Sequence, residues 1–179
     1  MIAKIINFIT LSRILSAILI YLILYLENNY LIALFLFLVA SFSDFLDGYL
    51  ARKTNSVSVL GEILDPIADK LLIVFVLIGL SINLDSFLIG FVSAVIISRE
   101  IWVAALRDIN ARNNQTDKTK VTFLAKTKTA IQMLTILMYL FGLTINSMMI
   151  LFFADIILII ALLVTIHTGY QYTISTFKK

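Results

Sequence analysis

The chain has 179 residues, of which 61% are apolar and 14% are charged, and its mean hydropathy is +1.03. This composition excludes an ordinary soluble domain, because a folded chain of this length could not bury so much apolar surface. The absence of cysteine excludes disulfides, zinc–thiolate centres and thiol chemistry, and the single histidine, His167, excludes a histidine cluster. Most of the chain is therefore predicted to lie in a lipid bilayer.

Six apolar segments are each long enough to cross a bilayer, which requires about 20 residues per helix. They occupy residues 5–26, 31–52, 61–82, 86–108, 121–144 and 148–170. The break between the last two rests on Gly142 and on the turn residues Asn146 and Ser147, so a five-helix arrangement is the alternative. We expect one all-α integral membrane domain over residues 1–179.

All 14 Lys and Arg residues fall at one membrane face in the six-helix arrangement, and the three connections at the opposite face contain none. By the positive-inside rule, the basic face is cytoplasmic. The arrangement therefore predicts a multi-pass protein of the plasma membrane with both termini in the cytoplasm. The net charge of +3 is then a consequence of topology and does not indicate binding to nucleic acid.

Four aspartates lie near the cytoplasmic ends of the second and third predicted helices. Asp44 and Asp47 are three residues apart, and Asp65 and Asp69 are four residues apart, so each pair lies on one face of its helix. The connection between the helices is short, which makes them antiparallel neighbours. The two pairs can therefore face each other at the cytoplasmic end of the bundle.

Four carboxylates in such proximity would repel one another by roughly 4 kcal/mol per pair at about 4 Å, with an effective dielectric constant near 20. They therefore need cations. Oxygen ligands without His or Cys favour hard divalent ions such as Mg²⁺ or Mn²⁺, and two such ions could clamp a diphosphate and neutralise its leaving group. The alternative is that either pair alone forms ion pairs with Arg52, Lys53 or Lys70.

From Asp44 to Asp69 the chain resembles the CDP-alcohol phosphatidyltransferase family, whose signature D-x2-D-G-x2-A-R-x8-G-x3-D-x3-D is matched at every position. The resemblance implies a six-helix membrane fold, a homodimer and a site for two Mg²⁺ or Mn²⁺ ions at its cytoplasmic end. It implies that Asp44, Asp47, Asp65 and Asp69 bind these ions, and that Asp69 is also the general base for an acceptor hydroxyl. The residues implied to contact CDP-diacylglycerol are Gly48, Ala51, Arg52 and Ser58.

Three further motifs resemble the branch of this family that uses glycerol 3-phosphate. They are Asn7-x2-Thr10-x2-Arg13, Ser98-Arg99-Glu100 and Lys126-Thr127-Lys128-Thr129-x2-Gln132. The resemblance implies transfer of the phosphatidyl group of CDP-diacylglycerol to glycerol 3-phosphate, with CMP as the leaving group, and it adds Asn7 and Thr10 to the CDP-diacylglycerol contacts. Inositol phosphate, serine or phosphatidylglycerol is the alternative acceptor.

The distribution of cations also favours a phosphorylated acceptor. Arg99, Arg107, Lys126 and Lys128 gather near the aspartates, where a phosphate would need charge-assisted hydrogen bonds. Simple membrane anchoring is the alternative for Arg107. A small cation transporter is the alternative from another class, because it too would hold intramembrane carboxylates. A transporter would place its acids near the bilayer midplane and often contain an inverted repeat, and no second Asp-x2-Asp-Gly occurs in the sequence.

Overall fold

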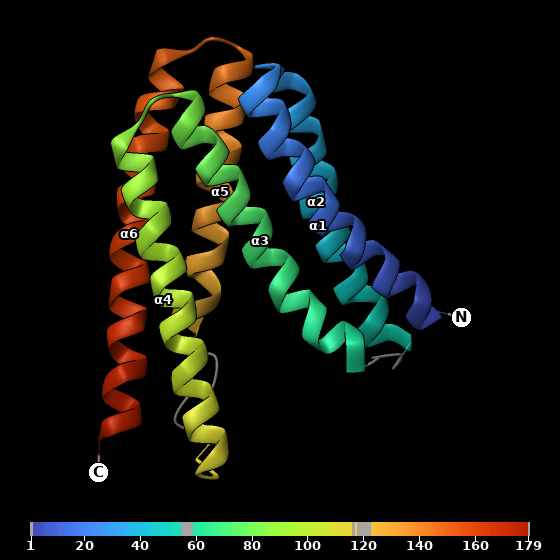
Figure 1. The fold of residues 1–179 in the computed structure, drawn as a ribbon, viewed down its shortest axis with the longest axis vertical. Coiled ribbons are helices and arrows are strands. Elements are labelled where there is room, and N and C mark those ends of the chain that lie inside the picture. Colours follow the sequence, from blue (N-terminus) through green and yellow to red (C-terminus); the bar gives the residue numbers. More distant parts are fainter. Residues whose placement is uncertain (1, 55–58, 116, 118–122, 179) are drawn as a thin grey trace.

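The structure is a computed structural model that describes residues 2–54, 59–115, 117 and 123–178. Within these ranges it does not describe the side chains of residues 2–6, 44–54, 59–60, 62–63, 123 and 125–126. The fold is all-helical (Figure 1). Its helices are α1 (Ile2–Leu26), α2 (Tyr30–Thr54), α3 (Val59–Asn83), α4 (Phe87–Arg112), α5 (Phe123–Thr144) and α6 (Met148–Phe177).

The six predicted helices are confirmed, and the five-helix alternative is wrong because the chain turns between α5 and α6 at residues 145–147. Two helices run further than expected, α4 to Arg112 and α6 to Phe177. Their added polar turns bind each other: the amide of Asn110 donates to the Thr176 hydroxyl at 2.8 Å. The expected helix ends were placed where the apolar runs end. The hydrogen bond between the two side chains stabilises polar turns beyond those ends.

The helix ends are closed by Asx residues in the left-handed backbone region. Asp85, Asn114 and Asn146 have φ values of 48°, 55° and 53°. In each case the next amide donates to the carbonyl five residues back, which satisfies an otherwise unpaired group at the helix C-terminus. Asn and Asp tolerate this conformation better than other non-glycine residues. Short connections thus become possible, and successive helices are antiparallel.

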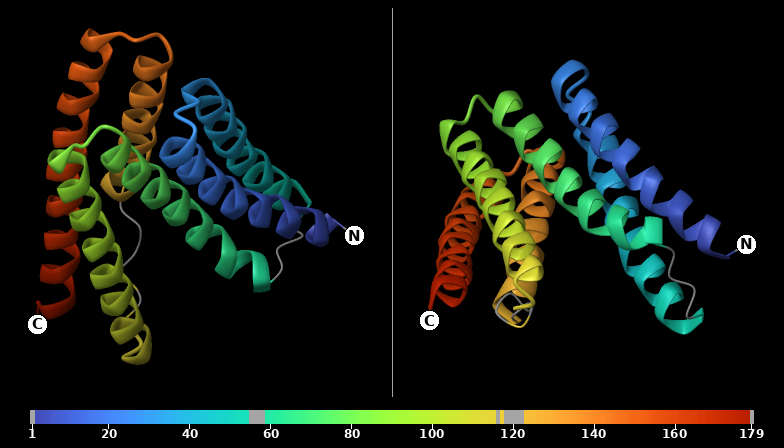
Figure 2. Two further views of the ribbon diagram at one scale, coloured as in Figure 1. Left: turned by 45° about the horizontal axis from the view of Figure 1, so that its top comes forward. Right: turned by 60° about the horizontal axis from the view of Figure 1, so that its bottom comes forward.

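The helices form two groups that separate toward one end of the molecule. α1 packs against α3 and α2, α6 packs against α5 and α4, and contacts between α3 and α4 and between α2 and α5 join the groups. Figures 1 and 2 show that both termini lie at the end where α3 diverges from α4. The connections at residues 27–29, 84–86 and 145–147 lie at the other end.

Small side chains allow close helix packing in the core. Ala17 of α1 and Ala33 and Ala40 of α2 are buried, and Gly79 of α3 lies against α1. A methyl group on Gly79 would lie 3.1 Å from Leu24 Cδ1, so a side chain there would require Leu24 to shift. Close approach of this kind is typical of helices that associate in lipid, where packing takes the place of the hydrophobic effect.

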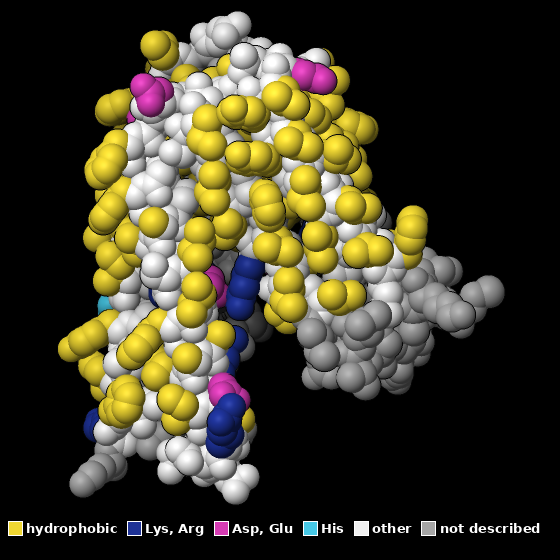
Figure 3. Space-filling model, viewed as in Figure 1, with side chains coloured by type: hydrophobic (Ala, Val, Ile, Leu, Met, Phe, Trp, Pro, Cys, Tyr) yellow, Lys and Arg dark blue, Asp and Glu magenta, His cyan; other side chains and the backbone are white. Residues whose placement is uncertain are grey.

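Three helical segments in the described part of the chain are long and apolar enough to cross a membrane, namely Asn7–Leu26, Phe87–Arg112 and Met148–Phe177. Their outer surfaces expose large apolar side chains, such as Leu15, Phe91 and Leu163 (Figure 3). A contiguous apolar surface of this kind is unfavourable in water and suits contact with lipid tails. These are features of a membrane protein.

Candidate active site

Two aspartates of α3 receive hydrogen bonds from α1. The Thr10 hydroxyl donates to Asp65 Oδ1 at 2.7 Å, and Arg13 Nη1 donates to Asp69 Oδ1 at 2.8 Å. Asp65 and Asp69 are one helical turn apart, as are Thr10 and Arg13, so both contacts form along one seam between the helices. Thr10 and Arg13 are fully buried. The first helix therefore fixes the orientation of both carboxylates.

Arg13 places a buried cation within an apolar helix. Such a charge is costly unless it is paired, and Asp69, whose side chain is 30% exposed, is its partner. The sequence had suggested Arg52, Lys53 or Lys70 as partners of the aspartates. The side chains of Arg52 and Lys53 are outside the described part of the structure, and Lys70 binds a glutamate instead.

Removing the charge of Arg13 is expected to destabilise the protein. The substitution Arg13→Met keeps most of the side-chain volume but leaves Asp69 without its buried partner, which should lower the free energy of unfolding by about 3 kcal/mol. The melting temperature in detergent measures this change. Arg13→Lys should recover part of the loss, and an unchanged melting temperature in Arg13→Met would show that the ion pair is not important.

The aspartates suit a divalent metal site. Asp65 and Asp69 supply two carboxylates on one face of α3, each held in place by a donor from α1. Asp44 and Asp47 lie on the helical backbone of α2, which adjoins α1, but their side chains are not described. No group of three metal-ligating side chains occurs among the side chains that the structure describes. The donor type, carboxylate oxygen, fits Mg²⁺ or Mn²⁺.

Several predicted contacts of CDP-diacylglycerol cannot be placed at side-chain level. Gly48, Ala51 and Arg52 lie on the backbone of α2, beyond the described side chains, and Ser58 lies outside the described residues altogether. The side chain of Asn7 is half-buried on α1, one turn before Thr10. Thr10 itself contacts Asp65, so in this structure its hydroxyl orients a carboxylate.

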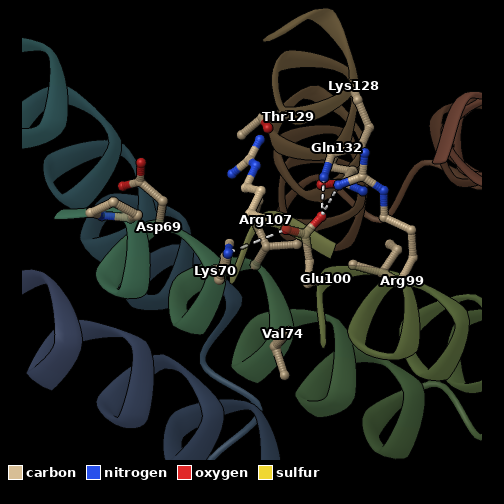
Figure 4. Close-up of a pocket in the computed structure, with 12 residues that line it drawn as sticks. Asp69, Lys70, Val74, Arg99, Glu100, Arg107, Lys128, Thr129 and Gln132 are labelled. Atoms are coloured by element: carbon tan, nitrogen blue, oxygen red, sulfur yellow. Dashed lines mark hydrogen bonds and ion pairs between the residues drawn. The ribbon is translucent and has the colours of Figure 1, made fainter. Parts of the chain in front are cut away.

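Beside Asp69, the diverging helices leave a pocket of about 200 Å³, which we call the cationic pocket (Figure 4). Its lining comes from α3, α4 and α5. The lining residues are Pro66, Asp69, Lys70, Ile73, Val74, Ile96, Arg99, Glu100, Arg107, Lys128, Thr129 and Gln132. The volume suits a small molecule, and eight of the twelve lining residues are polar or charged. Figure 3 shows charged side chains in this hollow between the two helix groups.

Three cations of the cationic pocket converge on Glu100. Arg99 Nη1 lies 2.8 Å from Glu100 Oε1, the Lys128 ammonium also contacts that oxygen, and Lys70 Nζ lies 3.4 Å from Oε2. We call these four residues the Glu100 hub. Only Lys70 is substantially exposed, at 41% of its side chain, against 6–15% for the other three. The hub links α3, α4 and α5 by charge.

The described lining of the cationic pocket carries more positive than negative charge. Lys70, Arg99, Arg107 and Lys128 stand against the carboxylates of Glu100 and Asp69, an excess of two positive charges. Asp69 additionally has Arg13 as its partner. Such an excess matches a phosphate monoester, which carries nearly two negative charges at neutral pH. Figure 4 places Asp69 on the α3 side of the pocket and the Glu100 carboxylate across from it, with Lys70 between them.

The chain is similar in sequence to known proteins. Residues 4–167 match the CDP-alcohol phosphatidyltransferase family, which is most of the chain. The protein is a member of that family. A relative from Rickettsia bellii is 38% identical over 169 residues, covering 93% of this chain and 91% of the relative. A relative from Haemophilus influenzae is 36% identical over 148 residues, covering 82% and 77%. Both are named CDP-diacylglycerol–glycerol-3-phosphate 3-phosphatidyltransferase.

Within this CDP-alcohol phosphatidyltransferase, the cationic pocket contains three of the four residues predicted to bind the acceptor phosphate, Arg99, Arg107 and Lys128. The fourth, Lys126, lies on the backbone of α5, and its side chain is not described. The pocket brings these cations together with Asp69, the predicted general base. The metal-binding, catalytic and acceptor-binding roles of all these residues stay predictions.

The sequence predicted no role for Arg13 or Glu100 at the site, and it gave Lys70 only as an alternative ion-pair partner of the aspartates. One signal was available for Arg13, because an ionisable residue inside an apolar helix is a functional candidate by default. Glu100 lay in a quoted motif, but its three partners come from three different helices. No local pattern in the sequence indicates such a convergence.

Proposed function

We propose that this chain transfers the phosphatidyl group of CDP-diacylglycerol to the 1-hydroxyl of sn-glycerol 3-phosphate, yielding phosphatidylglycerophosphate and CMP. One observation carries the proposal: Asp69 and four cations line the same pocket. A phosphorylated alcohol in that pocket could place its phosphate among the cations and its hydroxyl toward Asp69. Family membership and the names of the curated relatives support the same reaction.

In this proposal the acceptor is oriented by two groups at opposite sides of the pocket. Arg99, Arg107 and Lys128 would bind the phosphate, and a guanidinium can donate two parallel hydrogen bonds to phosphate oxygens. Asp69 would accept the proton of the attacking hydroxyl. The oxygen would then form a bond to the lipid-side phosphorus as the bond from that phosphorus to CMP breaks. Arg13 would hold the Asp69 carboxylate in position throughout.

The metal site completes the proposal. Asp44, Asp47, Asp65 and Asp69 would hold two Mg²⁺ or Mn²⁺ ions, which when bound would neutralise the diphosphate of CDP-diacylglycerol and the departing CMP. Asn7, Thr10, Gly48, Ala51, Arg52 and Ser58 would contact the CDP-diacylglycerol. Thr10 supports the metal site directly, because its hydroxyl holds Asp65. A transport function has no comparable support, since it does not account for a pocket with an excess of cations.

We further propose that all six helices cross the plasma membrane, with both termini and the active site at the cytoplasmic face. The connections at residues 27–29, 84–86 and 145–147 contain no Lys or Arg, whereas the end that carries the termini is basic. The positive-inside rule places that end in the cytoplasm. The lipid tails would remain in the bilayer while the headgroup reacts at its surface. A homodimer is proposed from the family resemblance.

The matched pair glycerol 3-phosphate and glycerol tests the acceptor, because the two differ only in the phosphate. Purified protein in detergent with CDP-diacylglycerol and Mg²⁺ or Mn²⁺ should release CMP with glycerol 3-phosphate, and at least a hundredfold more slowly with glycerol, because the site's charges would then lack their partner. Inositol phosphate, serine and phosphatidylglycerol complete the panel. Faster release with serine or another member of the panel would contradict the proposed acceptor, and metal chelation should stop every reaction.

A further inference from the structure

The last turns of α6 contact two arginines of α4, Arg99 and Arg107, which line the cationic pocket. Both arginines contact the Tyr172 ring: the guanidinium carbons of Arg99 and Arg107 are each 5.5 Å from the ring centroid. Tyr172 is 3% exposed and does not line the cationic pocket. Attraction between a cation and an aromatic face is strongest where water is excluded. A single buried ring thus brings together two cations that would otherwise repel each other.

Two further residues of α6 shape the position of Arg99. Its Nη2 donates to the Thr168 hydroxyl at 3.1 Å, and its aliphatic stem runs over Gly169. A methyl group added to Gly169 would lie 3.1 Å from Arg99 Cγ, so a larger residue would displace the stem. Arg99 is only 9% exposed, and its Nη1 donates to Glu100 Oε1 at 2.8 Å. We call Thr168, Gly169 and Tyr172 the α6 seat.

The α6 seat lies far in sequence from the aspartates of α2 and α3, which carry the phosphatidyl transfer in the proposed function. Its three residues contact Arg99, and Tyr172 also contacts Arg107. Both arginines are proposed to bind the acceptor phosphate, so the seat is suited to act on acceptor binding and not on the chemical step.

We propose that the α6 seat is a specificity-determining element, which positions Arg99 and Arg107 to bind the phosphate of the acceptor. This inference rests on the proposed function, since it takes a phosphorylated acceptor to be the substrate. The residues of the seat do not line the cationic pocket, so we treat them as positioning residues. Their loss should weaken acceptor binding and leave the turnover of bound substrates nearly unchanged.

The ring of Tyr172 is the feature to vary. Tyr172→Leu removes the ring, and the KM for glycerol 3-phosphate is expected to rise by about tenfold because two cation–π contacts are lost. Tyr172→Phe keeps the ring and should stay within about twofold of wild type. Neither variant should change kcat or the KM for CDP-diacylglycerol appreciably. The matched control is Tyr170→Leu, the same substitution on the same helix at a residue that is 64% exposed.

Gly169→Ala is a second, independent variant, because its methyl group would displace the Arg99 stem. It tests the proposal if Tyr172→Leu does not fold. It should raise the KM for glycerol 3-phosphate without changing the KM for CDP-diacylglycerol. Titration calorimetry of glycerol 3-phosphate with each protein gives a readout that does not depend on turnover. The dissociation constant should rise in parallel with KM.

Three outcomes are distinguishable. A selective rise of the acceptor KM in Tyr172→Leu and Gly169→Ala, absent in Tyr172→Phe and Tyr170→Leu, supports the seat. If the wild-type protein uses glycerol 3-phosphate but the variants keep its KM or lose only kcat, the positioning role of the α6 seat is wrong. The proposed function is not affected by that result. A wild-type protein that neither binds nor uses a phosphorylated acceptor overturns both.

Discussion

Replacing Asp69 with Asn is expected to lower acceptor-dependent CMP release by roughly a thousandfold, because the amide cannot accept the proton of the attacking hydroxyl. The same change removes a charged oxygen from the metal site. Asn keeps the shape of the side chain, and its carbonyl oxygen can still accept the hydrogen bond from Arg13. The purified variant, assayed with CDP-diacylglycerol, glycerol 3-phosphate and Mg²⁺ or Mn²⁺, gives the measurement.

Asp85→Asn is the matched control for this experiment. Asp85 is exposed in the α3–α4 connection at the opposite end of the molecule, with a φ of 48° that Asn also adopts readily. This variant should retain wild-type activity. If Asp69→Asn released CMP within tenfold of wild type while folding normally, Asp69 would not be the general base, and another carboxylate would have to take that role.

Replacing Glu100 with Gln is expected to lower the free energy of unfolding by about 3 kcal/mol, because Arg99 and Lys128 would remain buried without a carboxylate partner. The net charge of the pocket would also be more positive by one unit in the variant, because one carboxylate is lost. An anion that enters the pocket should therefore stabilise the variant more than the wild type, since a ligand that binds only the folded state raises its stability. The measurement is the melting temperature in detergent, with and without millimolar inorganic phosphate or glycerol 3-phosphate.

The control for this variant is Glu27→Gln, at an exposed glutamate in the α1–α2 connection. Its melting temperature should match that of wild type in every buffer. Equal melting temperatures of Glu100→Gln and wild type would mean that the Glu100 hub does not stabilise the bundle. Equal stabilisation of both proteins by phosphate would mean that the anion does not replace the carboxylate.

The helices were predictable because their signal is local and repeated. A bilayer span needs a long run of apolar residues, and the polar breaks at Asn28, Asp85 and Asn146 separate such runs. The helix ends were less accurate where they depend on pairing between helices. The final turns of α4 and α6 are polar in sequence and helical in the structure, and they bind each other through Asn110 and Thr176.

The candidate site was predictable only where its residues share a helix. The four-residue spacing of Asp65 and Asp69 predicted that both lie on one face of α3, and both receive hydrogen bonds from α1. The predicted juxtaposition with Asp44 and Asp47 involves side chains that the structure does not describe. The pairing of Arg13 with Asp69 joins positions 56 residues apart. The seat that Tyr172 provides for Arg99 and Arg107 depends on how α4 and α6 pack. Such contacts follow from tertiary packing and leave no periodic signal in the sequence.

The most direct test of the proposed reaction is the identity of the lipid product. Purified protein would be incubated with CDP-diacylglycerol, Mg²⁺ or Mn²⁺ and ¹³C-labelled glycerol 3-phosphate, and the lipids analysed by mass spectrometry. Our account predicts labelled phosphatidylglycerophosphate, formed in equal amount with CMP and absent when the metal is chelated. Folded protein that forms no labelled lipid under these conditions, or that forms a lipid only from a non-phosphorylated acceptor, would contradict it.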